Sequence, residues 1–194
     1  PVLLQRLRLL PSKCLNIVGL FRLPRLSTRI LLEGGHQSDA MVDEVSELDL
    51  PQNVIDLLVN EWNITRLHPP QAEALPVALS GENLLLAIPT ASGKSLVAYL
   101  AIIQRILVDI RGSRGVDRVP LKALASGKGE ELRGAGESLG FTVGMAVGDR
   151  SGETVSLDQA DVIVATSEKF DSLMRNRDGF LNQVSIVVAD EVHL

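Results

Sequence analysis

Hydrophobic and polar positions along residues 83–194 alternate between two kinds of segment. Short apolar runs are typical of buried parallel strands, and longer segments with helical spacing separate them. The strand-like runs are residues 83–88, 116–119 (a weak one), 141–147, 161–165 and 185–189, and the helix-like segments are 94–109, 122–139 and 166–175. This alternation predicts an α/β fold, with a parallel β-sheet that carries helices on both faces.

Two further helices are expected upstream of the first strand. Pro51 to Glu61 has apolar positions at helical spacing and a proline where a first helical turn tolerates it. Pro70 to Leu79 has the same character and is closed by Gly81. In contrast, the segment 122–139 contains four glycines, which lower helix propensity, so we expect a weak helix there.

Residues 1–40 differ in composition from the rest of the chain. They carry a net charge of +4 and show no clear helical or strand period, whereas residues 41–194 carry −9. We interpret residues 1–40 as an extension outside the folded domain, with Met41 as the biological start and the domain spanning 41–194. A transit-type peptide is the alternative, because the segment is rich in arginine and poor in acids.

Composition narrows the class of protein. The chain has 194 residues and 45% hydrophobic ones, which suits one globular domain and excludes a largely disordered chain. No apolar run approaches the ~18 residues of a membrane span. A single cysteine, Cys14, excludes a disulfide framework and favours a reducing, cytoplasmic setting. The net charge of −5 and 3% aromatic residues restrict any nucleic-acid contact to a local surface.

A phosphate-binding loop is predicted where the first strand gives way to its helix. The segment consists of Pro89, Thr90, Ala91, Ser92, Gly93, Lys94 and Ser95. Backbone N–H groups and the helix N-terminus would face an anion there. Lys94 would supply charge to the β- and γ-phosphates, and Ser95 a hydroxyl ligand for Mg²⁺. The generic pattern has a glycine where this chain has Ile88.

An acidic strand end completes the predicted nucleotide site. The apolar run 185–189 leads directly into Asp190 and Glu191. Asp190 would hold Mg²⁺, as such acids do in P-loop NTPases. Glu191 would orient or deprotonate the attacking water. With Lys94, these two acids are the candidate catalytic residues.

Five separated motifs resemble those of superfamily-two DExH-box helicases, closest to the superkiller-like branch that contains archaeal HelQ-type DNA helicases. The motifs are 69–71 (PPQ), 89–95 (PTASGKS), 120–124 (PLKAL), 166–169 (TSEK) and 190–193 (DEVH). The resemblance covers about residues 45–194. It implies that the sheet is the RecA-like ATP-binding domain of a P-loop NTPase motor, with ATP and Mg²⁺ as cofactors.

The resemblance also assigns contacts. Gln71 would read the adenine base, since an amide both donates and accepts. Contacts to the sugar–phosphate backbone of single-stranded or branched DNA would come from Pro120, Leu121, Lys122, Thr166 and Lys169. Backbone contacts carry no sequence information, and the lysines would make binding depend on salt. The implied activity is that of an ATP-dependent 3′–5′ DNA helicase in DNA repair and replication-fork processing.

The resemblance further implies a second RecA-like domain, which is missing from this chain. An arginine from that domain would stabilise the transition state, so we expect the fragment to bind ATP–Mg²⁺ and single strands weakly and not to unwind DNA. Alternatives stay open: an RNA helicase of the same branch, a nucleotide kinase, or a truncated, non-catalytic nucleotide-binding module.

Overall fold

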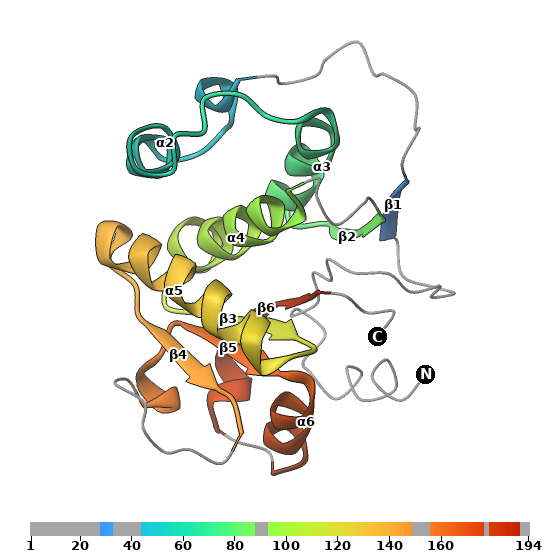
Figure 1. Ribbon diagram of the computed structural model, residues 1–194, viewed down its shortest axis with the longest axis vertical. Coiled ribbons are helices and arrows are strands. Elements are labelled where there is room, and N and C mark those ends of the chain that lie inside the picture. Colours follow the sequence, from blue (N-terminus) through green and yellow to red (C-terminus); the bar gives the residue numbers. More distant parts are fainter. Residues whose placement is uncertain (1–27, 33–43, 88–92, 149–155, 177–178, 191–194) are drawn as a thin grey trace.

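The computed structural model describes residues 28–32, 44–87, 93–148, 156–176 and 179–190 (Figure 1). The strands are β1 (Thr28–Leu32), β2 (Asn83–Ala87), β3 (Arg114–Val119), β4 (Val143–Ala146), β5 (Val162–Thr166) and β6 (Val184–Ala189). The helices are α2 (Gln52–Asp56), α3 (Pro69–Leu79), α4 (Lys94–Gln104), α5 (Lys122–Leu139) and α6 (Ser167–Asn176). Shorter turns are η1 (Val45–Glu47), η2 (Leu57–Glu61), η4 (Arg105–Asp109), η5 (Leu157–Gln159) and η6 (Gly179–Gln183).

All strand pairings are parallel, as the alternating pattern predicts. The main sheet has the order β4-β5-β3-β6, and β1 and β2 form a separate two-stranded sheet. The weak strand expected near 116–119 is β3, which lies between β5 and β6. Its glycine explains the weak signal, because a Cβ at Gly115 would come within 2.8 Å of the Ile102 side chain. The close approach of α4 therefore excludes a larger residue there.

Helices cover both faces of the main sheet (Figure 1). On one face α4 and α5 pack over the strands, and the larger hydrophobic core lies there together with α2 and α3. On the other face α6 and η6 enclose a smaller core around Val116 and Ile163. The prediction of a parallel sheet with helices on both faces is confirmed.

The helix expected to be weak is the longest one, α5, with 18 residues. Two of its glycines, Gly129 and Gly136, lie on its buried face. A Cβ at Gly129 would meet the Met145 sulfur at a clashing distance, and one at Gly136 would meet the backbone oxygen of Phe141. These glycines let the helix approach β4, so tertiary packing outweighs their low propensity.

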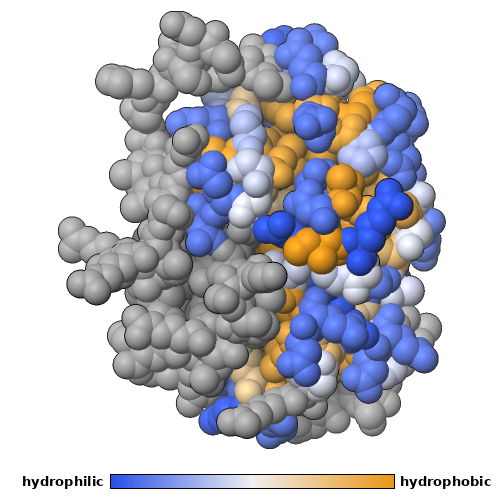
Figure 2. All heavy atoms as spheres, turned by 180° about the vertical axis from the view of Figure 1, so that it is seen from behind, coloured by the Kyte–Doolittle hydropathy of each residue, from blue (hydrophilic) through white to orange (hydrophobic). Residues whose placement is uncertain are grey.

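The helices at 51–61 and 94–109 are found, but each ends in a π-helical turn, η2 and η4. Within the segment interpreted as an extension, β1 pairs with β2 over five residues. The domain boundary at Met41 itself stays a prediction. Figure 2 shows one face of the molecule, on which apolar side chains lie in several areas between polar ones. Of the helices within the described ranges, none is long and apolar enough to cross a membrane.

Candidate functional site

Parallel pairing brings three of the predicted site residues, Pro120, Thr166 and Asp190, to one edge of the main sheet. Strands β3, β5 and β6 run in the same direction, so their carboxyl ends coincide. Pro120 follows β3, Thr166 ends β5, and Asp190 follows β6. The Asp190 N–H donates to the carbonyl oxygen of Arg118 at 3.0 Å, which fixes the acid beside the end of β3.

Gly93 starts α4 in the left-handed conformation, with φ +72° and ψ +32°. This is a backbone region that favours glycine. Lys94 and Ser95 form the first turn of α4 and are half-buried. The helix has 11 residues, so its N-terminal N–H groups and dipole can interact with an anion.

Gln71 connects α3 to this helix start. Its Nε2 group donates to the carbonyl oxygen of Gly93 at 3.1 Å, while its Oε1 accepts from the His68 N–H at 2.9 Å. The side chain is only 4% exposed. In this structure the amide therefore bonds on both sides to the protein, and its predicted contact to adenine stays a prediction.

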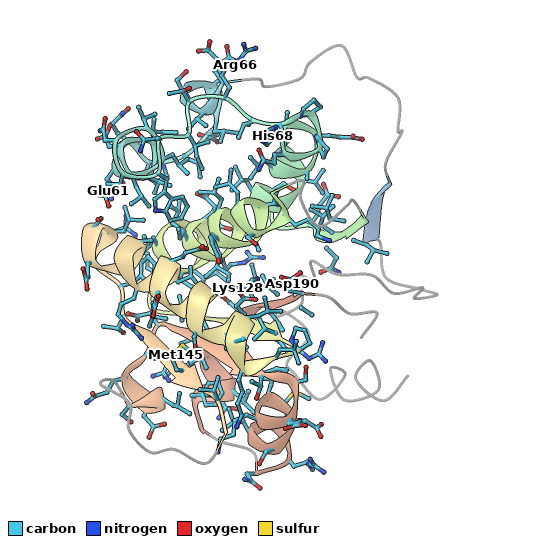
Figure 3. All side chains as sticks on the ribbon, in the orientation of Figure 1. Glu61, Arg66, His68, Lys128, Met145 and Asp190 are labelled. Carbon is cyan, nitrogen blue, oxygen red and sulfur yellow. The ribbon has the colours of Figure 1, made fainter. Side chains whose placement is uncertain are left out.

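The predicted metal ligand Asp190 lies in an ion-pair network that sequence patterns did not reveal. The Lys128 ammonium on α5 lies 3.0 Å from Asp190 Oδ2 and 3.1 Å from Asp117 Oδ2 on β3. Figure 3 shows Lys128 and Asp190 side by side, between α5 and the end of β6. Asp117 is completely buried, whereas the Asp190 side chain is 22% exposed.

Tyr99 extends this network to the helix that begins with Lys94. The Lys128 ammonium lies 5.7 Å from the centre of the Tyr99 ring, a cation–π distance. The Tyr99 hydroxyl donates to Glu131 at 2.7 Å, and Trp62 packs edge-on against the same ring at 6.1 Å. Helix α4 is thus linked to Asp190 through Tyr99 and Lys128.

Burial and the neighbouring charges shift the pKa values of Asp117 and Lys128 in opposite directions. Burial raises the pKa of Asp117, and the nearby Lys128 ammonium offsets this only in part. For Lys128, burial alone would lower the pKa, but Asp117 and Asp190 together raise it above its ordinary value. Burial and the bond to Glu131 raise the pKa of Tyr99, which stays neutral. The network therefore places one ammonium between the carboxyl groups of Asp117 and Asp190.

The residues predicted to contact nucleic acid lie at the ends of β3 and β5. Leu121 is 57% exposed and Lys122 is exposed, whereas Lys169 is half-buried and Thr166 is buried. The Ser167 hydroxyl donates to the carbonyl oxygen of Val119 at 3.2 Å, which ties the two segments together. The structure thus places these two predicted motifs side by side.

Several predicted site residues lie outside the described residues: Pro89, Thr90, Ala91, Ser92 and Glu191. Conversely, Asp117, Lys128 and Tyr99 were missed. The sequence signal that could have found Lys128 is a charged residue on a helix face whose other residues are apolar. Lys128 lies on the face of α5 that also carries Ala125 and Leu132, whereas Asp117 lies in a strand that also contains Arg114 and Arg118.

A cavity of about 420 Å³ lies elsewhere, at the amino ends of the strands. Its lining includes Ser113 before β3, Phe141 before β4 and Asp161 before β5. None of the predicted site residues that the structure describes lines it. Ligands of parallel α/β sheets bind at the opposite, carboxyl edge, so we do not assign this cavity to the site.

Several known proteins are similar in sequence to this chain. Proteins named ATP-dependent DNA helicase Hel308 are 45% identical to the chain in Pyrococcus horikoshii and 46% in Methanocella arvoryzae. Each match covers 78% of this chain, but only 21% and 20% of the relative, so the chain spans about a fifth of their length.

Solved structures show the same fold. The RNA helicase Prp28 from Chaetomium thermophilum bound to ADP has a TM-score of 0.66 and 26% identity, over 82% of this chain and 41% of that one. A hypothetical ATP-dependent RNA helicase from Sulfolobus tokodaii has a TM-score of 0.61 and 19% identity, over 74% and 42%. The family model for DEAD/DEAH box helicases matches residues 68–194. The chain therefore belongs to the DEAD/DEAH box helicase family.

Proposed function

We propose that the chain is the ATP-binding motor domain of an ATP-dependent 3′–5′ DNA helicase that acts in DNA repair and replication-fork processing. One observation carries the proposal. A left-handed glycine followed by Lys94 and Ser95 begins α4, and Asp190 follows a buried parallel strand that is linked to the same helix. The relatives named ATP-dependent DNA helicase, at 45–46% identity, support the choice of nucleotide and of DNA.

The residues present fit a nucleotide with its metal. A hydroxyl and a carboxylate, Ser95 and Asp190, are oxygen ligands of the kind that Mg²⁺ prefers. Bound ATP–Mg²⁺ would supply the phosphoryl group that water attacks, with its charge partly neutralised by the metal. Lys94 and the N–H groups of the α4 start would hold the phosphates, with Pro89, Thr90, Ala91, Ser92 and Gly93 forming the loop. Glu191 would orient the water.

Gln71 has a second proposed role besides adenine recognition. Its bond to Gly93 couples α3 to the phosphate-binding helix start. If adenine takes over one of the two amide contacts of Gln71, the hydrogen bond from Gln71 to Gly93 changes with the base that is bound. ATP would then be favoured over GTP through the geometry of this loop.

The exposed end of β3 and the start of α6 support a backbone-binding surface. Leu121 and Lys122 face solvent, and Lys169 lies across the β3–β5 edge from them. We propose that Pro120, Leu121, Lys122, Thr166 and Lys169 contact one nucleic-acid strand through its sugar–phosphate backbone. The net charge of the chain is −5, so we expect this contact to be local and weak.

RNA is the second candidate substrate, because the two solved neighbours are RNA helicases. Their identity is 19–26%, well below that of the DNA helicase relatives. Binding of fluorescent single-stranded DNA and RNA of one sequence, at two salt concentrations, separates the candidates. Tighter DNA binding that weakens as salt is raised is expected, while a preference for RNA would move the assignment to an RNA helicase.

Nucleotide-dependent thermal stability tests the ATP site. ATP–Mg²⁺ should raise the melting temperature of the wild-type chain and not that of Lys94→Ala, because a ligand that binds only the folded state stabilises it. GTP should do less. Glu191→Gln should retain nucleotide binding and lose any residual hydrolysis. A wild-type chain that saturating ATP–Mg²⁺ leaves unchanged would contradict the proposed function.

A further inference from the structure

The Lys128 ammonium connects an interior acid to the acid of the proposed metal site. It reaches Asp117 on β3 at 3.1 Å and Asp190 after β6 at 3.0 Å. An ammonium has three N–H donors, so it can bond to both carboxylates at once. Figure 3 shows Lys128 extending from α5 toward Asp190 at the edge of the sheet.

Asp117 and Asp190 differ in whether another cation can take the place of the Lys128 ammonium. Asp117 is completely buried, and its Oδ1 has no hydrogen-bond partner among the described residues. Its charge therefore depends on Lys128. Asp190 is 22% exposed at the carboxyl edge, where a metal with its water shell could approach. Lys128 is thus anchored on the buried side and can exchange its partner only on the open side.

We propose that Lys128 acts as the resident counter-cation of Asp190: anchored by Asp117, it pairs with the Asp190 carboxylate and competes with Mg²⁺ for it. The inference rests on the proposed function, since it concerns the same metal site. It assigns a role to two residues, Lys128 and Asp117, outside the phosphate loop and the acidic motif.

The charges predict how each residue changes metal binding. Asp117 shares the ammonium with Asp190, so Asp117→Asn should leave Lys128 bound more tightly to Asp190 and also remove a nearby negative charge. Mg²⁺ should then bind less well. Adding Lys128→Gln in that background removes the competing cation while no unpaired buried carboxylate remains. Mg²⁺ should then bind better than in Asp117→Asn.

The experiment measures the dissociation constant of a fluorescent ATP analogue in excess MgCl₂ and in EDTA, with the 194-residue chain. The constant in EDTA divided by the constant in MgCl₂ reports the contribution of the metal. The constant in EDTA alone checks the phosphate loop. From Asp117→Asn to Asp117→Asn/Lys128→Gln this ratio should rise, because the ammonium that competes with Mg²⁺ for Asp190 is gone. Circular dichroism confirms that each variant folds.

Asp117→Asn/Arg133→Gln is the matched control. It removes a positive charge from an exposed position of the same helix and should keep the ratio of Asp117→Asn. A purely structural Lys128 would change the melting temperature and leave the ratio unmoved, and that result would overturn the inference. If the wild-type chain binds no analogue even in MgCl₂, the proposed function fails first, and the inference fails with it.

Discussion

The side-chain amide of Gln71 donates to the carbonyl oxygen of Gly93 at 3.1 Å, across 22 positions of sequence. The same amide accepts from the His68 N–H, so one side chain forms hydrogen bonds at the starts of both α3 and α4. There is no room between them, since a Cβ on Gly93 would clash with Gln71 Nε2. The turn proposed to bind phosphate is therefore shaped by a residue outside the loop.

Gly93→Ala should destabilise the chain and weaken nucleotide binding. A left-handed alanine costs about 1–2 kcal/mol, and the displaced Gln71 adds the loss of a hydrogen bond. Urea unfolding measures the free energy, and the fluorescent ATP analogue measures binding. Gly134→Ala is the control, because a Cβ there meets nothing within 4 Å and its effect on binding should be negligible. Equal effects of the two variants would contradict this interpretation.

Gln71→Ala should lower stability even without nucleotide. It removes the bond that caps α3 and the bond to Gly93 from a nearly buried position, a loss of about 1–2 kcal/mol of unfolding free energy. The exposed Gln52, which bonds only to Asp56 in its own helix, provides the matched control Gln52→Ala. Unchanged stability of Gln71→Ala in nucleotide-free urea unfolding would leave adenine recognition as its only role.

Particular residues show what the sequence could predict. Local periodicity predicts the strand β2, the helix α4 and the acid after β6, because each depends on neighbouring residues. The bond between Gln71 and Gly93 joins two helix starts, and the Lys128 ion pairs join a helix to two strands. Such contacts depend on how elements pack, which no single segment encodes. The best sequence signal was Lys128, which shares a helical face with the apolar Ala125 and Leu132.

Removing Lys128 should cost far more stability than removing the charge of Asp117. Lys128→Met leaves two carboxylates with no ammonium between them, one of them completely buried, a loss of about 3–5 kcal/mol. Asp117→Asn leaves one ammonium paired with Asp190 and should cost much less. Urea unfolding of both variants checks the asymmetry. A larger loss for Asp117→Asn would mean that Asp117, and not Lys128, stabilises the network.

The stability difference between wild type and Asp117→Asn should depend on pH. Burial raises the pKa of Asp117 in the folded state, so the folded chain holds this proton more strongly than the unfolded chain, whose aspartates titrate near ~3.9. Wild-type stability relative to Asp117→Asn should therefore fall as pH rises from about 4 through the raised pKa. Urea unfolding at several pH values measures it. A difference that grows with pH would reverse the assigned direction.

Gly136→Ala and Gly134→Ala should have opposite effects although they lie two residues apart in α5. A Cβ at Gly136 would meet the backbone oxygen of Phe141, which cannot turn away as a flexible side chain could, so overpacking of about 1–3 kcal/mol is expected. Gly134 is exposed with open space around it, so alanine there should stabilise the helix by up to ~1 kcal/mol. Unfolding free energies of both variants measure the contrast. Two stabilising substitutions would show that α5 does not need its close approach to β4, and two destabilising ones would show that helix propensity has no weight at position 134.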